Sequence, residues 1–257
     1  MKIGVKGEVI IRDKEGKTYR YKNQVQQQLI QTIIQYAKTG GIISNYSYTI
    51  QLLSNGAVIG VYTGSMYYQQ ISTSLQLMFT FIISDVSLPA NTIQLYLLSS
   101  LGSFLVAQIN NITLPSGSMQ IIWTLSFDIS PQDYFTPYLI FAFFSPPSNS
   151  TPFNNTPLTN VQSAINAIQN IGYLSSPPTY YITYNGQYIE VNVSFSNNSI
   201  SIYYQLSITT STVTYNNLNI VVTASNGYVN LMAPIQQAVV QVGQSASIYY
   251  NAIWTTS

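Results

Sequence analysis

The side chains that most often carry catalysis or bind metals are scarce in this chain. Its 257 residues include no His and no Cys, which excludes metal sites built on imidazole or thiolate and also Ser-His-Asp and Cys-His nucleophiles. The glycines form no phosphate-binding fingerprint, because no G-x-G-x-x-G or G-K-[ST] follows a strand-like run. We therefore predict that the protein is not an enzyme and needs no metal or cofactor.

The seven carboxylates leave one possible acid pair outside the charged N-terminus. Asp128 and Asp133 lie five positions apart, and glycoside hydrolysis uses two carboxyl groups. Both residues flank Pro131 at a break in the strand pattern, where Asp commonly closes a turn or caps a helix. We interpret them as turn and cap residues.

All basic residues lie in the first 38 positions. They are Lys2, Lys6, Arg12, Lys14, Lys17, Arg20, Lys22 and Lys38. With three carboxylates in the same stretch its net charge is +5, whereas the remaining 219 residues carry −4. Such asymmetry indicates a surface that docks onto an acidic patch of another subunit, or onto nucleic acid, or simply a solvated hairpin and helix. Nucleic acid is the least suitable partner, because acidic residues are interleaved and no aromatic-rich RNA-binding signature is present.

The rest of the surface must be covered by neutral groups. Charged residues make up only 6% of the chain, while 22 residues are Tyr; an ordinary soluble domain has about 25% charged residues. Low net charge favours association, so we expect a subunit that packs against copies of itself and other proteins. The tyrosines suit protein interfaces and also sugar binding, or they simply divide between core and solvent face.

Six N-x-[ST] sequons provide candidate glycosylation sites, about as many as chance gives in a chain rich in Asn, Ser and Thr. They begin at Asn45, Asn111, Asn149, Asn154, Asn192 and Asn197. Asn149 and Asn154 fall in the proline-rich stretch "SPPSNSTPFNNTP", and we expect these two to be the most accessible.

The elements that position these residues begin with a hairpin and a helix. "GVKGEVIIRDKEGKTYRYKN" predicts two strands joined by a turn at residues 13–16. The next run, "NQVQQQLIQTIIQYAKTGG", predicts a helix capped by Asn23 and ended by Gly40-Gly41. A second helix is expected in "TPLTNVQSAINAIQNIG", ending at Gly172; its apolar face is formed by Val161, Ala164, Ile165 and Ile168.

Short alternating runs fill residues 46–127 and the region after residue 173, which predicts antiparallel strands. The expected fold is mainly β: two tandem antiparallel β-sandwich, jelly-roll-like domains, each preceded by a short helix. We place the domains at residues 1–130, which include the N-terminal hairpin and helix, and 131–257, with the boundary where Pro131 and Pro137 break the run.

The two halves repeat one pattern. A shift of 125 aligns Ser74–Gly102 with Ser199–Gly227 without a gap and brings "NTIQLYLLSSLG" onto "NNLNIVVTASNG". With small slips, Ala107 and Ile109 meet Ala233 and Ile235, and "IIWT" meets "AIWT". Internal duplication explains these matches; strand alternation in a restricted alphabet is the alternative.

No run of 18 apolar residues is present, so no transmembrane helix is predicted. Charges occupy the N-terminus where a signal peptide needs its apolar segment. A composition suited to a harsh exterior is therefore combined with no evident export signal. A virion protein, assembled in the host cytoplasm and released in a particle, fits both observations.

The whole chain resembles virion proteins of viruses that infect hyperthermophilic acidophilic archaea. The resemblance lies in the Tyr/Ile/Asn/Gln/Ser-rich, Cys-free composition, in "GEVIIRDKEGKTYRYKN" before a helix, and in "WTLSF" closing a strand run. Turret and penton-base proteins of turreted icosahedral viruses are the nearest match. The resemblance implies β-sandwich or jelly-roll domains, with a basal domain in the capsid shell.

Our leading hypothesis is a structural subunit of a virion, such as a capsid, turret, penton-base or tail component, that docks through its basic N-terminal region. One alternative is an extracellular filament or adhesin subunit that exchanges an edge strand with its neighbours. The other is a carbohydrate-binding attachment protein that recognises host surface glycans.

Overall fold

The structure is a computed structural model that describes residues 1–86, 89–114, 117–144, 159–207 and 210–256. Within those ranges the protein is mainly β, as the sequence predicts, with three helices, α1 (Gln27–Thr39), α2 (Phe135–Phe144) and α3 (Thr159–Asn170). The strands of the first half are β1 (Lys2–Asp13), β2 (Thr18–Val25), β3 (Ser47–Ser54), β4 (Ala57–Ile71), β5 (Ser74–Ile83), β6 (Thr92–Ser99), β7 (Gly102–Asn110) and β8 (Met119–Asp128). Those of the second half are β9 (Tyr180–Tyr184), β10 (Gln187–Glu190), β11 (Val193–Phe195), β12 (Ser199–Ser207), β13 (Val213–Ala224), β14 (Gly227–Asn230), β15 (Ile235–Val240) and β16 (Ser245–Thr256).

The first half is a closed antiparallel barrel. Its eight strands follow the order β1-β2-β7-β6-β3-β4-β5-β8, and β1 pairs with β8 from Val5↔Phe127 to Asp13↔Met119 to complete the circle. Alternate side chains of β1, β3, β5, β6 and β8 fill the interior, and Trp123 on β8 is completely buried. The expected jelly-roll sandwich is therefore wrong for this half, because the N-terminal hairpin joins the sheet and closes it instead of standing apart from it.

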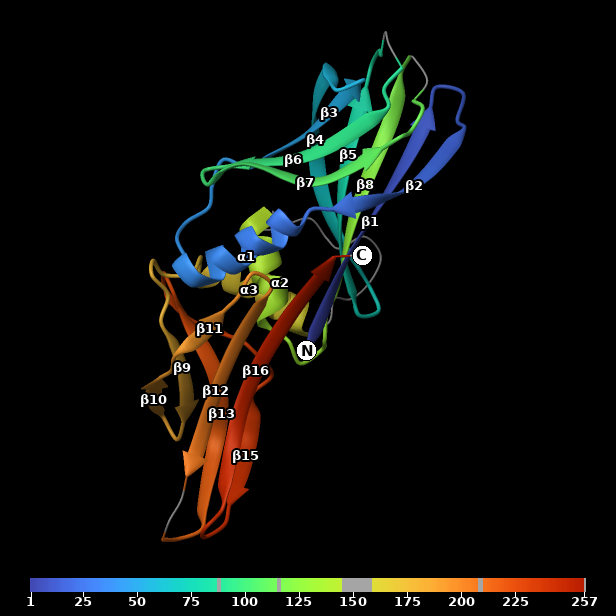
Figure 1. Cartoon of the computed structure of the whole chain (residues 1–257). Helices are drawn as coiled ribbons and strands as arrows, with labels where there is room; N and C mark the ends of the chain where they lie inside the picture. The colour runs from blue at the N-terminus through green and yellow to red at the C-terminus, as the bar shows by residue number, and fades with distance from the viewer. Residues whose placement is uncertain (87–88, 115–116, 145–158, 208–209, 257) are drawn as a thin grey trace.

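The second half consists of two sheets that do not close. One sheet has the order β10-β9-β13-β14, with β15 also paired to β13, and the other contains β11, β12 and β16. The second sheet continues into the barrel because β16 runs parallel to the start of β1, from Lys2↔Ile253 to Val5↔Thr256. Figure 1 shows the result: the barrel lies at one end of an elongated molecule, the second half at the other, and the three helices between them.

The two halves have the same hairpin registers. The pair Ser99↔Gly102 closes the turn between β6 and β7, and the pair Ala224↔Gly227 closes the turn between β13 and β14. Each residue of the second pair lies 125 positions after the corresponding residue of the first. The pairing of β5 with β8 and that of β12 with β16 also keep one register under this shift. The strands of "NTIQLYLLSSLG" and "NNLNIVVTASNG" thus hold equivalent places in the two sheets.

The correspondence covers six barrel strands. In the order of pairing, β4-β3-β6-β7 matches β10-β9-β13-β14, β5-β8 matches β12-β16, and β11 takes the place of the second part of β4. Among the strands that the structure describes, the hairpin β1–β2 has no counterpart in the second half. Duplication stays a prediction, as do the boundaries 1–130 and 131–257.

Two of the residue pairs that were matched in the sequence do not hold equivalent places in the structure. Trp123 corresponds to Ile248 rather than to Trp254, because the tryptophans lie 131 residues apart while their strands are related by 125. Both indoles are buried, so the similarity of "IIWT" and "AIWT" reflects burial rather than equivalent position. Ile109 is buried whereas Ile235 is 40% exposed, so this pair also differs.

Helices α1 and α3 form where the sequence predicts them. Gly40 ends α1, and its N–H donates to the carbonyl of Tyr36 at 2.8 Å; Gly172 follows α3 with a positive φ of 89°. Asn23 is not the N-cap of α1, because it lies in β2, where its side chain packs over Gly7. No helix in the described ranges has both the length and the apolar character needed to cross a bilayer.

Helix α2 was not predicted, and all ten of its residues are buried. Its sequence is apolar on every side, so it shows no amphipathic period. It lies between the two halves (Figure 1).

Buried or partly buried tyrosines donate hydrogen bonds to carbonyls at or just after the C-terminal ends of the three helices. Tyr46 Oη donates to the carbonyl of Ala142 at 2.6 Å, and Tyr48 Oη donates to that of Phe144, so both satisfy the C-terminus of α2. Two further bonds act in the same way at the other helices; they run from Tyr138 to Gly172 after α3 and from Tyr180 to Ala37 in α1. The last carbonyls of a helix have no partner within it, so phenol groups here do what charged side chains do in other proteins.

Candidate interaction surfaces

Six of the eight cations gather on the β1–β2 hairpin. They are Lys6, Arg12, Lys14, Lys17, Arg20 and Lys22, all exposed. In β1 and β2 the apolar residues point into the barrel, so the alternation of a strand sends the charged residues to the outside. The predicted turn at residues 13–16 forms, and Asp13 Oδ1 fixes it by accepting from the backbone N–H groups of Glu15 and Lys17.

Only some of these cations are paired. Lys6 Nζ lies 3.2 Å from Asp128 on β8, and Arg20 lies 3.4 Å from Glu8. Lys17 Nζ lies 4.9 Å from the centroid of the Tyr19 ring. In the described ranges Arg12, Lys14 and Lys22 have no carboxylate within salt-bridge distance. We call the exposed face of the hairpin, formed by the six cations, the basic hairpin face.

Lys2 and Lys38 lie apart from this face. Lys2 is opposite Ile253, where β1 meets β16, and Lys38 lies in the last turn of α1. The predicted docking set of eight residues is therefore divided by the fold into one group of six and two separate lysines.

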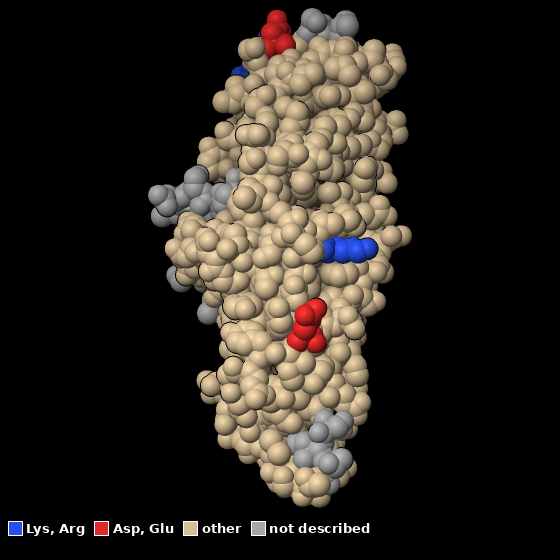
Figure 2. All heavy atoms as spheres, turned by 90° about the vertical axis from the view of Figure 1, so that its left-hand side faces the viewer, with Lys and Arg blue, Asp and Glu red and all other residues tan. Residues whose placement is uncertain are grey.

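Away from the hairpin the surface is nearly uncharged. Figure 2 shows one such face, on which Lys, Arg, Asp and Glu occur at a few scattered points. Residues 191–257 contain no charged side chain at all. The surface away from the hairpin is nearly neutral, as predicted, because few charged residues lie in the later part of the sequence.

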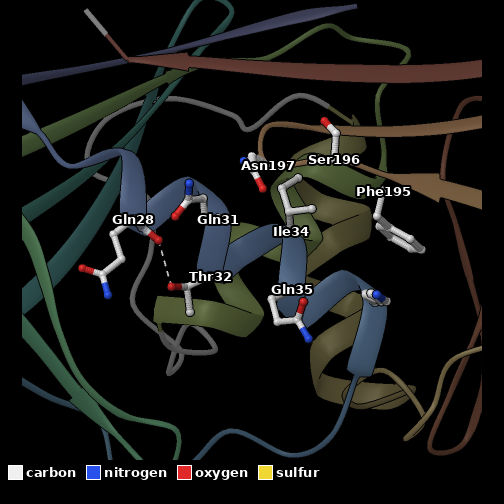
Figure 3. Close-up of a pocket in the computed structure, with 9 residues that line it drawn as sticks. Gln28, Gln31, Thr32, Ile34, Gln35, Phe195, Ser196 and Asn197 are labelled. Atoms are coloured by element: carbon white, nitrogen blue, oxygen red, sulfur yellow. Dashed lines mark hydrogen bonds between the residues drawn. The ribbon is translucent and has the colours of Figure 1, made fainter.

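A groove of about 480 Å³ separates α1 from the turn between β11 and β12. Figure 3 shows Gln28, Gln31 and Gln35 on the helix side and Phe195 to Asn197 opposite. Thr32 is bonded to the backbone of its own helix, with Oγ1 donating to the carbonyl of Gln28 at 2.8 Å. Amide side chains line much of the groove and Lys38 lies at it as well, so the groove offers hydrogen bonds and one positive charge.

The sequons within the described ranges are all exposed. Asn45 and Asn111 both have a positive φ in turns beside β3 and β7. Asn192 lies between β10 and β11, and Asn197 lines the groove of Figure 3. Asn149 and Asn154 lie outside the described residues.

Asp133 serves as a helix cap, as expected from sequence, and it is 1% exposed. Its Oδ1 accepts from the N–H groups of Phe135 and Thr136 at 3.1 and 3.0 Å, at the start of α2. Tyr250 Oη donates to the same oxygen at 3.4 Å. Burial raises the pKa of Asp133 to about 6. Asp128 instead faces outward and pairs with Lys6, so the two carboxyl groups have different surroundings and tasks.

An exposed tyrosine cluster was missed by the sequence analysis. The rings of Tyr181, Tyr188 and Tyr228 lie with centroids 4.9 to 6.0 Å apart. Tyr181 and Tyr188 come from the consecutive strands β9 and β10, whereas Tyr228 comes from β14, which β13 separates from β9 in the sheet. The doublet Tyr180-Tyr181 was the one sign of this cluster in the sequence. Successive side chains of a strand point to opposite faces, so one of the two rings must lie on the outside.

Tyr228 also lines a cavity of about 270 Å³ beside α3. Tyr134 and the side chains of Asn166, Asn170 and Asn230 line it as well. Aromatic faces and amide groups thus meet at one place on the second half.

The comparisons with known proteins identify a viral relative. The chain is 57% identical to the uncharacterized protein ORF258 of Acidianus filamentous virus 2 (isolate Italy/Pozzuoli), over 258 residues that cover all of both proteins. No protein-family model matches the chain, and no solved structure matches it. The chain belongs to the family of this archaeal virus protein.

Proposed function

We propose that the protein is a non-catalytic structural subunit of a viral particle, which docks to another virion protein through the basic hairpin face. The observation that carries the proposal is the concentration of six cations on one hairpin of a molecule that has only two other Lys or Arg residues. A local field of one sign steers and orients a partner of the opposite sign. The partner would therefore present an acidic patch.

Docking explains the charges better than stability or nucleic-acid binding does. Exposed ion pairs such as Lys6–Asp128 stabilise a fold by about 0 to 1 kcal/mol, so six cations are more than the hairpin needs. Glu8, Asp13 and Glu15 are interleaved with them, and this alternation suits a patterned protein surface more than a continuous phosphate backbone.

The viral relative favours a viral particle over a cellular filament, since its virus is filamentous and its protein matches the chain from end to end. A turret or penton base belongs to icosahedral vertices. A component of the body, surface or end of a filament is the form of the proposal that agrees with this relative.

The test is charge reversal of three cations on the basic hairpin face, compared with charge reversal of the two lysines away from it. We expect Arg12→Glu, Lys14→Glu and Lys22→Glu together to reduce the copy number of the protein in purified particles at least tenfold, because none of these cations has a carboxylate within salt-bridge distance in the described part of the chain. Lys2→Glu with Lys38→Glu provides the control, since both lie off the basic hairpin face. Quantitative mass spectrometry of particles gives the copy number. Equal incorporation of both variants would contradict the proposal.

A second candidate function is attachment to host surface glycans, and the tyrosine cluster with its adjoining cavity favours it. Sugar rings present apolar faces that stack on aromatic rings, and their hydroxyl groups pair with amides such as those of Asn170 and Asn230. Tyr188→Ala with Tyr228→Ala should abolish binding in a glycan array, whereas Tyr67→Ala, an exposed Tyr of β4 in the barrel, should not. Absence of binding by the unaltered protein would exclude this candidate.

A further inference from the structure

The first part of β16 has one unpaired edge. Residues 245–250 pair with β12, whereas no residue within the described ranges pairs with them on the opposite side. The equivalent strand of the barrel, β8, is paired along both edges, by β5 and by β1. Under the shift of 125 the stretch of β8 that β1 covers, residues 119–127, corresponds to residues 244–252. The described part of the second half therefore has no strand at the position that β1 occupies in the barrel.

Two hydrogen bonds reveal which groups face that edge. The N–H of Ile253 donates to the carbonyl of Met1 at 2.9 Å, and the N-terminal amine donates to the carbonyl of Asn251 at 2.7 Å. Asn251 and Ile253 are both odd-numbered, and the backbone groups that they use in these bonds face β1. The N–H and C=O of successive residues point to opposite edges of a strand, so Ser245, Ser247 and Tyr249 present their backbone groups to the open edge.

Nothing in the sequence protects this edge. Natural proteins block exposed edges with Lys, Pro or bulges, but β16 contains no charged residue and no Pro. Its outward side chains include Tyr249, which is 55% exposed and lies opposite Tyr203 of β12, 58% exposed. The edge and the face beside it are thus neutral and partly aromatic, as in many protein interfaces.

We propose that residues 245–250 form a pairing surface for a second copy of the chain, with β16 running antiparallel to β16 of that copy across a twofold axis near Ser247. In this arrangement Ser245 and Tyr249 of one copy meet Tyr249 and Ser245 of the other. Three facing residues on each strand supply about six backbone hydrogen bonds. The pairing joins the sheet that contains β16 in one copy to the same sheet in the other copy. It uses a different surface from the docking proposed for the basic hairpin face.

A second copy is the occupant that the sequence favours. A twofold interface brings identical patches together, and two copies of an uncharged strand meet without repulsion. Residues 145–158 of the same chain are poor candidates on sequence grounds, because their prolines at positions 146, 147, 152 and 157 cannot donate to a strand ladder.

Analytical ultracentrifugation of the full chain over a wide concentration range tests the proposal. We expect a reversible monomer–dimer equilibrium. Ser247→Pro removes one edge-facing N–H from each copy without touching the ladder with β12, and it should raise the dissociation constant about thirtyfold, since each net hydrogen bond is worth about a factor of five. A purely monomeric unaltered chain, or a Ser247→Pro variant that associates as before, would overturn the proposal.

Two lysine variants give a matched comparison. Ser247→Lys and Ser201→Lys both lie on the outer face of the same sheet, and each loses one side-chain hydrogen bond, to Tyr203 and to Asn251 respectively. Only Ser247 lies at the open edge, while Ser201 lies on β12 between β11 and β16. We expect Ser247→Lys to abolish the dimer and Ser201→Lys to retain it; an equal effect would argue against edge pairing.

A photoreactive phenylalanine analogue at Tyr249 identifies the occupant. A cross-link to β16 of a second copy supports the proposal, whereas a cross-link to residues 145–158 of the same chain or to a different protein refutes it. The glutamate variants of the basic hairpin face should dimerise normally. The experiments can therefore reject virion docking without rejecting edge pairing, and edge pairing without rejecting virion docking.

Discussion

The barrel and the second half place similar strands in the same order, yet over the described residues the barrel closes and the second half does not. In the barrel the hairpin β1–β2 fills the position between β8 and β7. In the second half the corresponding strands are β16 on one side and β14 with β15 on the other, and the residues described there form no such hairpin between them. One supersecondary unit thus distinguishes a closed sheet from an open one.

The same hairpin carries six of the eight cations of the chain. The half that has it is closed and charged at one end, and the half that lacks it is open and uncharged after residue 190. Closure and charge together suit the barrel to contact acidic partners, while an uncharged edge suits the second half to contact its own kind.

The halves are also joined covalently and by hydrogen bonds through β1. Its first residues pair with β16 and its later residues with β8, so one strand belongs to both sheets. A direct contact between the halves adds to this connection, since Phe127 of the barrel and Trp254 of β16 lie with ring centroids 6.4 Å apart.

The largest effect is expected from the two tryptophans. Trp123→Ala in the barrel and Trp254→Ala in the second half should each lower the free energy of unfolding by about 3 to 5 kcal/mol, because each removes a completely buried indole. If β1 joins the halves into one cooperative unit, calorimetry will show a single transition in both variants. Two separate transitions, with only one shifted by each substitution, would show that the halves unfold independently.

The next effect concerns Asp133 and depends on pH. The pKa of this group is raised in the folded protein, from 3.8 to about 6, so its neutral form is the one the fold prefers. The stability it contributes is fully present below pH 3.8 and is lost as the pH rises through about 6. A shift of this size corresponds to about 3 kcal/mol. Asp133→Asn retains a capping oxygen without the charge, and thermal melts from pH 3 to 8 should show that the loss on raising the pH disappears. An unchanged pH profile would refute this role.

Smaller losses of stability are expected from substitutions at two tyrosines that hold equivalent places in the two halves. Tyr48, opposite Leu97, and Tyr180, opposite Val222, hold matching places on β3 and β9, and each donates to a carbonyl at a helix C-terminus. Tyr48→Phe and Tyr180→Phe should each lower stability by about 1 to 3 kcal/mol by leaving that carbonyl without its partner. Chemical denaturation measures both. Tyr203→Phe, at an exposed position, is the control and should change little; equal values for all three would contradict the role of the phenol groups.

The smallest effect should come from the ion pair on the basic hairpin face. Lys6 and Asp128 are 61% and 49% exposed, so Lys6→Ala should change stability by less than about 0.5 kcal/mol at moderate salt. A larger loss would mean that the cations of the hairpin serve the fold, and it would weaken the case that they serve a partner.

The candidate surfaces differed in how well the sequence predicted them. The grouping of Lys6 to Lys22 was predictable because a hairpin keeps neighbours in sequence close in space. The separation of Lys38, the cluster of Tyr181, Tyr188 and Tyr228, and the burial of Asp133 were not, because each depends on strands and helices distant in sequence.

Local patterns determined the strand-rich composition, the hairpin turn, helices α1 and α3, and the confinement of positive charge to one end, since each of these is fixed by residues within a few positions of one another. Tertiary structure alone decided that the barrel closes, that α2 is a buried helix and that β16 keeps an open edge. The physical reason is that side-chain alternation specifies which face of a strand is buried, while the backbone groups along its two edges are the same in every sequence. Which strand occupies an edge is therefore settled only when the whole chain has folded.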